Sequence, residues 1–325
     1  MFKWRKLGQL FDPKTYPMQT WMHEFAQSPS TLILKDRVRV VFCSRPRPDP
    51  EGMYVSYLAS LDLDRNDPTR ILEISDAPLM QLGERGCFDE FGTNPVSVIA
   101  DGPRIRAYYA GWTRCESVPI NGCIGLAISE DLGRTFRRLG PGPILSYSVD
   151  EPFLLGSPRI RRFNERWVLF YVSGKRWIAM DGARPEPVYK IRAATSDNGL
   201  DWTKLGHDLI EDRLGPNECQ ACPDVAWHND CYHMFFSYRD SHHYKVGTGG
   251  YRIGYAWSTD MLAWHRADHM AGIGVSSSGW DSQMASYPHV FLLDGKWFML
   301  YQGNEMGRAG IGIAQLDQLD LTCPQ

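Results

Sequence analysis

Apolar and polar residues alternate along the chain in short runs that are separated by turn residues. In residues 124–140, for example, alternating apolar positions lead into a polar Ser-Glu-Asp turn and then into a second, shorter run. Alternation with a period of two predicts a strand with one buried face, and the intervening turn predicts a hairpin. No long segment has the 3.6-residue apolar period of an amphipathic helix. The pattern therefore predicts an all-β protein.

This hairpin pattern recurs five times. Each unit begins with a small polar or aromatic residue that is followed directly by proline. An apolar strand, a turn and an aromatic-rich strand come next. The opening pairs are Ser28-Pro29, Asn94-Pro95, Ser157-Pro158, Cys222-Pro223 and Tyr287-Pro288. Third and fourth strands are expected in residues 124–140, 190–206 and 252–267. Because the prolines stand 63 to 66 residues apart, the predicted fold is a five-bladed β-propeller with four antiparallel strands per blade, in a single domain over residues 1–325.

The two ends of the chain predict how the ring closes. The last unit reaches its third strand at residues 310–317 and then has almost no residues left for a fourth. Residues 4–8, however, match the fourth-strand segments 136–140 and 202–206. We therefore expect residues 1–12 to complete the last blade, which would close the ring and remove an exposed sheet edge.

Composition and charge exclude several classes of protein. The 325 residues are 43% hydrophobic and 22% charged, which excludes a disordered chain. With 35 Lys and Arg against 38 Asp and Glu, and no long run of one sign, no nucleic-acid partner is expected. No stretch reaches the roughly 18 apolar residues of a membrane span and the N-terminus lacks a signal-peptide pattern, so a cytoplasmic location is expected. The histidines form no ligand motif, and neither a metal nor a cofactor is expected.

Carboxylates precede the first strand in four of the five units. Glu24, Glu90, Glu218 and Asp281 lie five to seven residues before the corresponding proline. In a propeller the first strand of each blade lines the central channel, so we expect these side chains to enter one funnel. Converging carboxylates repel, and at least one should keep its proton. A protonated acid beside an ionised partner is what glycosidic cleavage requires, so the predicted acid is Glu218, with Glu90 or Asp281 as its partner.

Cationic, aromatic and polar residues end the second strands on the same face. They include Arg45, Trp112, Tyr238, Arg239, Asn304 and Glu305. Aromatic rings with polar neighbours suit a sugar, whose ring has an apolar C–H face and a hydroxyl edge. Several arginines in one funnel would also accommodate an anion such as phosphate or a carboxylated sugar. The expected partner is a saccharide or glycoconjugate, with phosphate or another anion as a further ligand.

Two sequence features give the chain a family resemblance. A proline opens strand one of each unit, and strand three carries the signature Ile-Gly-x-Ala-x-Ser-x-Asp at residues 124–131 and 253–260, followed by Phe136 and Trp264. In these features the chain resembles the five-bladed propellers of glycoside hydrolase families 43, 32 and 130 over nearly its whole length. It is similar in particular to glycosidase-related proteins encoded among bacterial surface-polysaccharide genes. The resemblance implies a propeller fold and a carbohydrate ligand.

The catalytic positions of those families are not kept. Where the arabinanase-like family has Asp before the first two prolines, this chain has Ser28 and Asn94, and residues 155–157 stand where its acid Glu belongs. The Glu-Cys-Pro of the invertase-like family has its nearest counterpart in Ala-Cys-Pro at 221–223. The Glu-Asp-Pro-Arg of the mannoside phosphorylases has Gly-Ser-Pro-Arg at 156–159 as its counterpart, which keeps only Arg159. Either the acids have moved to the four carboxylates named above, or the hydrolytic chemistry is lost.

Three functions follow from these observations. The leading hypothesis is a glycoside hydrolase that uses the funnel carboxylates. A second is a phosphorylase or glycosyltransferase, in which Arg159, Arg239 and His289 would hold phosphate or the diphosphate of a nucleotide sugar. The third is a carbohydrate-binding propeller without catalysis, which the missing family carboxylates favour.

Overall fold

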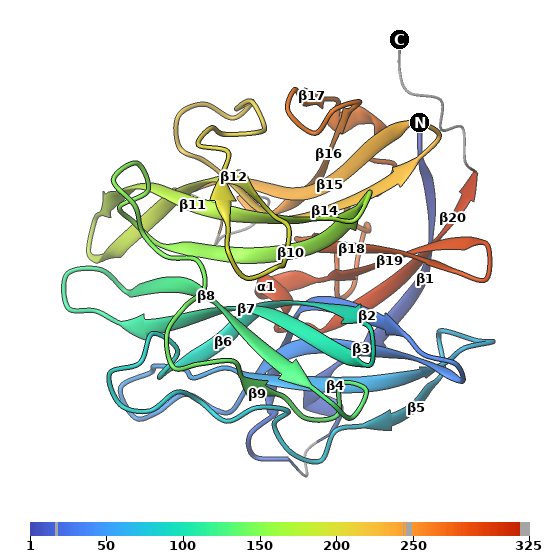
Figure 1. Cartoon of the computed structure of the whole chain (residues 1–325), viewed down its shortest axis with the longest axis horizontal. Coiled ribbons are helices and arrows are strands. Elements are labelled where there is room, and N and C mark those ends of the chain that lie inside the picture. The colour runs from blue at the N-terminus through green and yellow to red at the C-terminus, as the bar shows by residue number, and fades with distance from the viewer. Residues whose placement is uncertain (17–18, 243, 245–248, 319–325) are drawn as a thin grey trace.

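Five four-stranded antiparallel sheets surround a central axis (Figure 1). The computed structural model describes residues 1–16, 19–242, 244 and 249–318. The first two sheets are β2 (Glu24–Ile33), β3 (Arg37–Arg45), β4 (Tyr57–Asp64) and β5 (Ile71–Ile74), then β6 (Gly92–Asp101), β7 (Arg104–Arg114), β8 (Ile120–Ser129) and β9 (Arg137–Arg138). The next two are β10 (Leu155–Phe163), β11 (Arg166–Met180), β12 (Ala183–Ser196) and β13 (Thr203–Lys204), then β14 (Glu218–His228), β15 (Cys231–Asp240), β16 (Arg252–Ser258) and β17 (His265–Arg266).

The fifth sheet joins the two ends of the chain. It contains β18 (Ser286–Leu293), β19 (Lys296–Gln302), β20 (Ile311–Gln318) and, at its outer edge, β1 (Lys3–Phe11). Strand β1 runs antiparallel to β20, from Lys3 opposite Gln318 to Phe11 opposite Ile311. Figure 1 shows the dark blue β1 beside the red β20. The predicted five-bladed propeller, closed by the N-terminal strand, is confirmed; its extent as a single domain over residues 1–325 stays a prediction.

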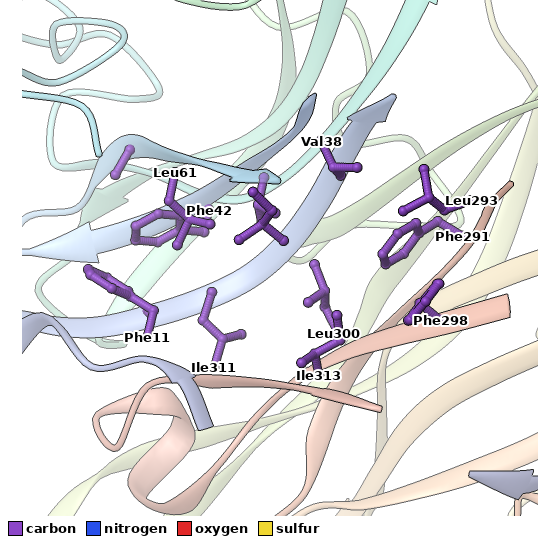
Figure 2. Packing of buried hydrophobic residues seen from close by; sticks show 14 of the residues in the cluster. Phe11, Val38, Phe42, Leu61, Phe291, Leu293, Phe298, Leu300, Ile311 and Ile313 are labelled. Atoms are coloured by element: carbon purple, nitrogen blue, oxygen red, sulfur yellow. The ribbon is translucent and has the colours of Figure 1, made fainter. Parts of the chain in front are cut away.

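The inner strands meet in ring order, with β2, β6, β10, β14 and β18 each contacting the next and β18 contacting β2. Apolar side chains fill the space between neighbouring blades. Between the fifth and first blades, Phe11 of β1 packs with Phe42 of β3, and Leu300 and Ile311 belong to the same buried cluster (Figure 2). Burying one such side chain stabilises the fold by roughly 1.5–3 kcal/mol. The contact that closes the ring is therefore as apolar as an ordinary core.

The proline that opens each unit and the residue before it form a bulge in the inner strand. The register between the first and second strands shifts at this position in all five blades. Ser28, Ser157, Cys222 and Tyr287 have φ between 43° and 54°, and the Asn94-Pro95 peptide bond is cis. A bulge bends a strand and redirects its side chains. The sequence repeat thus marks the points where the inner strands turn side chains toward one end of the channel.

Helices are few and short in the described residues. They are α1 (Asn304–Gly307) and the 3-10 turns η1 (Pro13–Thr15) and η3 (Asp268–Met270). None of the helices in this part of the chain has the length and apolar character needed to cross a membrane.

Candidate functional site

A pocket of about 560 Å³ opens at the end of the ring where the inner strands begin and the second strands end. All five blades contribute to its lining. Residues at or next to the bulges reach it from four blades, namely Gln27, Asn94, Ser157 and Tyr287. A second cavity of about 390 Å³ shares Gln27, Arg45, Tyr244 and Met306 with it. The bulged strands therefore build one concave surface, which we call the funnel pocket.

The third blade supplies the longest wall of the funnel pocket. Strands β11 and β12 have 15 and 14 residues, more than any other strand in the described chain, and their hairpin extends past the ring. The hairpin brings Trp177, Arg184, Glu186 and Tyr189 to the pocket. The second cavity lies beside the pocket and is lined by residues of the first, fourth and fifth blades.

Aromatic rings line the funnel pocket on several sides. Trp112 is partly exposed, and its Nε1 donates to Ser56 Oγ at 3.1 Å. Tyr189 and Tyr251 are joined through their hydroxyl groups, and the ring of Tyr251 meets Tyr287 edge to face at 5.6 Å. Burial raises the pKa of Tyr189 and of Tyr287 well above the ordinary value. Their hydroxyls therefore stay protonated and can donate hydrogen bonds to a ligand.

Two predicted arginines, Arg45 and Arg239, line the pocket. Arg239 is only 3% exposed, and its guanidinium lies 3.5 Å from the centroid of the Tyr244 ring. Its Nη2 donates to the Tyr189 hydroxyl at 3.3 Å. Arg45 lies over Phe25 at 4.6 Å. The guanidinium groups of Arg45 and Arg239 are thus held against aromatic faces.

One carboxylate, Glu186, lines the funnel pocket among the described residues. It is nearly buried, and its Oε2 accepts a hydrogen bond from the Tyr244 hydroxyl at 2.9 Å. Glu305 lines the second cavity, where it is exposed and lies 3.2 Å from Arg308. A pair of carboxylates facing each other across a sugar-sized gap is therefore not formed by the lining residues that the structure describes.

Glu218, the predicted acid, is buried inside the fourth blade and does not line the pocket. Its Oε1 lies 2.6 Å from Arg266 Nη1, and its Oε2 accepts from the backbone N–H of Arg213 and Leu214 at 2.9 and 2.8 Å. Burial raises the pKa of Glu218, but these backbone donors, the Gln220 side chain and Arg266 outweigh it, so the pKa is lowered. The expectation that Glu218 keeps a proton is wrong, because its partners favour the ionised form.

Asp281 is also held within its own blade. Its Oδ2 lies 2.6 Å from Lys6 Nζ and accepts from the Tyr301 hydroxyl at 3.0 Å. Burial raises its pKa, but the bonds from Lys6 and Ser276 outweigh burial and lower it. The predicted ionised state agrees with these contacts, but Asp281 does not line either cavity.

The arrangement around Asp281 recurs in two other blades. In each, a carboxylate before strand one accepts a hydrogen bond from a strand-two tyrosine and lies within 2.6 Å of a strand-four cation. The sets, which we call carboxylate clamps, are Asp89 with Tyr109 and Arg138, Glu151 with Tyr171 and Lys204, and Asp281 with Tyr301 and Lys6. The clamps fasten the outer strand to the start of the inner one, and of the four predicted carboxylates Asp281 belongs to one.

The remaining two predicted carboxylates also lie outside both cavities. Glu24 Oε2 accepts from the Tyr54 hydroxyl at 2.8 Å and lies 3.4 Å from Arg308. Glu90 Oε2 accepts from the backbone N–H of Gly86 at 2.9 Å. The four carboxylates therefore do not share a funnel, because each is engaged with separate partners.

Arg159 and His289, predicted to hold phosphate, are buried in the middle of the channel. The backbone N–H of Thr31 donates to His289 Nε2 at 3.0 Å, so the ring proton is on Nδ1 and faces Asp224 at 2.8 Å. Arg159 Nε lies 3.8 Å from Asp224, and Arg161 also pairs with that carboxylate. Burial lowers the pKa of His289 to about 4. These residues join three inner strands to Thr31 of a fourth and are not free to bind phosphate.

Two further predicted binding residues have structural contacts instead. Tyr238 lies against the guanidinium of Arg266 at 4.6 Å. Asn304 Oδ1 accepts from the backbone N–H of Gln283 and Met284 at 2.7 and 3.0 Å. Neither residue lines the two cavities.

Several residues of the pocket were not predicted from the sequence. They are Glu186, Tyr189, Tyr244 and Tyr287. Tyr287 could have been found, because it occupies the position before proline whose counterparts Asn94 and Ser157 also line the pocket. Glu186 and Tyr189 lie in the long hairpin of β11 and β12, and the spacing of the prolines gives no sign of it, because this unit is as long as the others. Tyr244 had no comparable signal.

Some known proteins are similar to this chain in sequence, and others share its fold at low sequence identity. No sequence-family profile matches the chain. It is 33% identical over 315 residues to the uncharacterised protein Rv1502 of Mycobacterium tuberculosis strain H37Rv, covering 97% of this chain and 99% of that protein. The uncharacterised protein MT1551 of strain CDC 1551 matches with the same identity and coverage.

The fold is shared with solved glycoside hydrolases. A structure described as a glycoside hydrolase superposes with a TM-score of 0.74 at 17% identity, over 100% of this chain and 96% of that one. A BT0996 complex with RGII gives 0.72 at 17% identity over 100% and 95%, and a thermostable family-43 glycoside hydrolase gives 0.63 at 14% identity over 91% and 89%. The resemblance to glycoside hydrolase propellers is therefore confirmed for the fold.

Proposed function

We propose that this chain, which belongs to the family of the uncharacterised Mycobacterium tuberculosis protein Rv1502, is a carbohydrate-binding protein. It would be a member of the glycosidase-like propellers, with the funnel pocket as its saccharide site. The observation that carries this proposal is the lining of that pocket. Trp112 and Trp177 stand at its edge together with Tyr189, Tyr244 and Tyr287. Aromatic faces of this kind bind the C–H side of a sugar ring, and the amides of the bulges supply donors for its hydroxyls.

Fold neighbours support a saccharide as the ligand. Several are glycoside hydrolases, and one is the BT0996 complex with RGII. The bulge positions that open toward the pocket here carry amide, hydroxyl and phenol groups in place of carboxylates. We therefore infer that this chain keeps the saccharide pocket of a glycosidase-like propeller with a different set of polar groups.

Cleavage by a pair of carboxylates is the function that the geometry favours less. Hydrolysis requires two carboxyl groups about 5–5.5 Å or roughly 6.5–9.5 Å apart on either side of the bond. Glu186 is the single carboxylate that lines the funnel pocket in the described part of the chain, and the four predicted carboxylates are engaged elsewhere.

Glu186 does favour a second candidate, transfer to phosphate. In phosphorolysis an ionised phosphate oxygen attacks the anomeric carbon, the glycosidic C–O bond breaks, and one acid gives its proton to the departing oxygen. Because phosphate is already an anion, this reaction needs no carboxylate base. A single carboxyl beside arginines is sufficient for it.

Binding and turnover can be tested together. Titration calorimetry with purified oligosaccharides should show binding to the wild-type protein and a loss of about tenfold or more in affinity for Trp112→Ala. Trp227→Ala is the matched control, because Trp227 is 52% exposed beside the cavity at the opposite end of the inner strands.

The same saccharides are then incubated with the protein, with and without phosphate, and analysed by chromatography. Unchanged saccharide supports a binding function. Cleavage only with phosphate, lost in Glu186→Gln, would support the second candidate. Cleavage without phosphate would show that hydrolysis is retained and would refute the main proposal.

A further inference from the structure

Two arginines of the funnel pocket, the buried Arg239 and the partly buried Arg45, have no carboxylate partner among the described residues. No ion pair joins Arg45 or Arg239 to an acidic residue in the described chain, although both line the pocket. Buried arginines elsewhere are paired: Arg39 lies 2.7 Å from Asp62, and Arg266 lies 2.6 Å from Glu218. Within the described residues, the pocket thus holds two positive charges that no carboxylate pairs with.

The surroundings of Arg45 are aromatic. Its guanidinium lies 4.6 Å from the Phe25 ring centroid and 5.5 Å from that of Tyr54. Its Nε is buried and has no hydrogen-bond partner. Burial lowers the pKa of Arg45, as expected for a desolvated cation. These rings position the group without neutralising it.

Arg239 is held in a similar way. Its contacts are the Tyr244 ring at 3.5 Å, the Asp240 carbonyl at 3.2 Å and the Tyr189 hydroxyl at 3.3 Å. Its Nε is also buried without a hydrogen-bond partner. Tyr287, which lines the pocket, is within electrostatic range of both Arg239 and Arg45. Arg45 and Tyr244, whose ring covers Arg239, also line both the funnel pocket and the second cavity, so the two cations lie along one continuous surface.

An unpaired charge in such a place destabilises the folded protein unless a ligand neutralises it. Desolvation of an ion costs several kcal/mol in real proteins, and arginine cannot avoid this cost by losing its proton. Unpaired charges of this kind are expected at functional sites, where a bound ligand can neutralise them. Planar guanidinium groups form their strongest hydrogen bonds with carboxylate and phosphate oxygens.

We propose that the funnel pocket selects an acidic saccharide, whose carboxylate or phosphate group is bound by Arg45 and Arg239 while its sugar ring lies on the aromatic wall. The proposal rests on the saccharide-binding function above and names the class of its ligand. Glu186 contributes through Tyr244, which joins the carboxylate to the ring that covers Arg239. Glu24 stands in the same relation to Arg45, because the Tyr54 hydroxyl donates to Glu24 and the Tyr54 ring lies 5.5 Å from the Arg45 guanidinium. Arg45 is the residue to test, because it lines both the funnel pocket and the second cavity.

The first experiment needs no ligand. Arg45→Met keeps an apolar chain on Phe25 and removes the unpaired charge, so its melting temperature should stay within about 2 °C of the wild type or rise. Arg39→Met is the contrasting variant, and it should lose several degrees because Asp62 is left unpaired. A similar loss for Arg45→Met would show that its charge is already neutralised within the protein and would overturn the proposal.

The second experiment uses four probes: a uronic acid oligosaccharide, its carboxyl-reduced neutral counterpart, a sugar phosphate and inorganic phosphate. The wild-type protein should bind at least one acidic sugar about ten- to a hundredfold more tightly than the neutral counterpart. Arg45→Gln should remove that preference, so that the variant binds the acidic sugar and its neutral counterpart with similar affinity. The uronic acid and phosphate arms show which acidic group is bound.

The outcomes distinguish the proposed saccharide-binding function from the proposed acidic class of the ligand. Equal binding of acidic and neutral sugars overturns the acidic class but keeps the saccharide function. Binding of inorganic phosphate that depends on Arg45, without binding of any sugar, keeps the anion site and overturns the saccharide function. Failure of all four probes to bind, with unchanged stability in their presence, overturns both.

Discussion

Lys6 Nζ lies 2.6 Å from Asp281 Oδ2, so an ion pair joins the first strand of the chain to the segment that leads into its last inner strand. The Tyr301 hydroxyl donates to the same oxygen at 3.0 Å. Phe2 and Trp4, also near the N-terminus, are buried among residues of the fourth and fifth blades. The ring is therefore closed by backbone pairing, by a carboxylate clamp and by apolar burial together.

Removal of residues 1–12 should strongly lower the melting temperature. The truncation exposes the edge of β20, leaves Asp281 without its cation and removes buried aromatic side chains. Lys6→Met removes the ion pair alone and should lower the free energy of unfolding by about 1–3 kcal/mol. Lys3→Met, at an exposed position on the same strand, should have no measurable effect. Thermal unfolding followed by circular dichroism measures both. A truncated protein with the wild-type melting temperature would contradict the closure argument.

Glu218→Gln should destabilise the protein by about 1–3 kcal/mol, because Arg266 loses one of its two carboxylate partners and keeps Asp268 at 2.9 Å. The folded pKa of Glu218 lies below its unfolded value of 4.5, so its contribution is present above that pH and is lost as the pH falls below it. The variant should therefore show a flatter dependence of melting temperature on pH between about 5 and 3. The exposed Glu165→Gln serves as the control, and identical pH profiles for Glu218→Gln and the wild type would refute this assignment.

Gly92→Ala should impair saccharide binding without unfolding the protein. A Cβ at this position would lie 1.9 Å from Trp112 Nε1 and 2.4 Å from Ser56 Oγ, so the indole must move and its hydrogen bond must break. Gly140→Ala is the matched control, since nothing lies within 4 Å of a Cβ there. Affinity for the best oligosaccharide should fall several-fold in the first variant alone. Unchanged affinity in Gly92→Ala would mean that the position of Trp112 does not determine binding.

Tyr171→Phe should cost about 1 kcal/mol, because Glu151 loses the hydroxyl that donates to it at 2.8 Å but keeps Arg192 and Lys204. Chemical denaturation would measure the change, with the partly exposed Tyr16→Phe as the reference. A cost near zero would show that the hydroxyl is not needed by the clamp.

The carboxylates show how a correct sequence pattern can lead to a wrong function. Their register before the prolines is regular enough to be recognised in the sequence, and Asp281 has the expected charge state. Their direction depends on partners that lie elsewhere in the chain, such as Lys6 and Arg266. Because a strand-four cation contacts the carboxylate only after the blade has formed, spacing alone could not distinguish a clamp from a catalytic funnel.

The sequence by itself determined the propeller, since period-two alternation, the five prolines and the match of residues 4–8 to other fourth strands are local or repeated signals. It also determined that Trp112, Arg45 and Arg239 end strands on the pocket side. Only the tertiary structure decided which polar groups share the pocket, because this depends on the bulges and on one long hairpin. It placed Arg159 and His289 in a buried network, brought Glu186 and Tyr244 together, and left Arg45 and Arg239 without acidic partners. Ion pairing is decided by distances between blades, and those distances are set only when the ring closes.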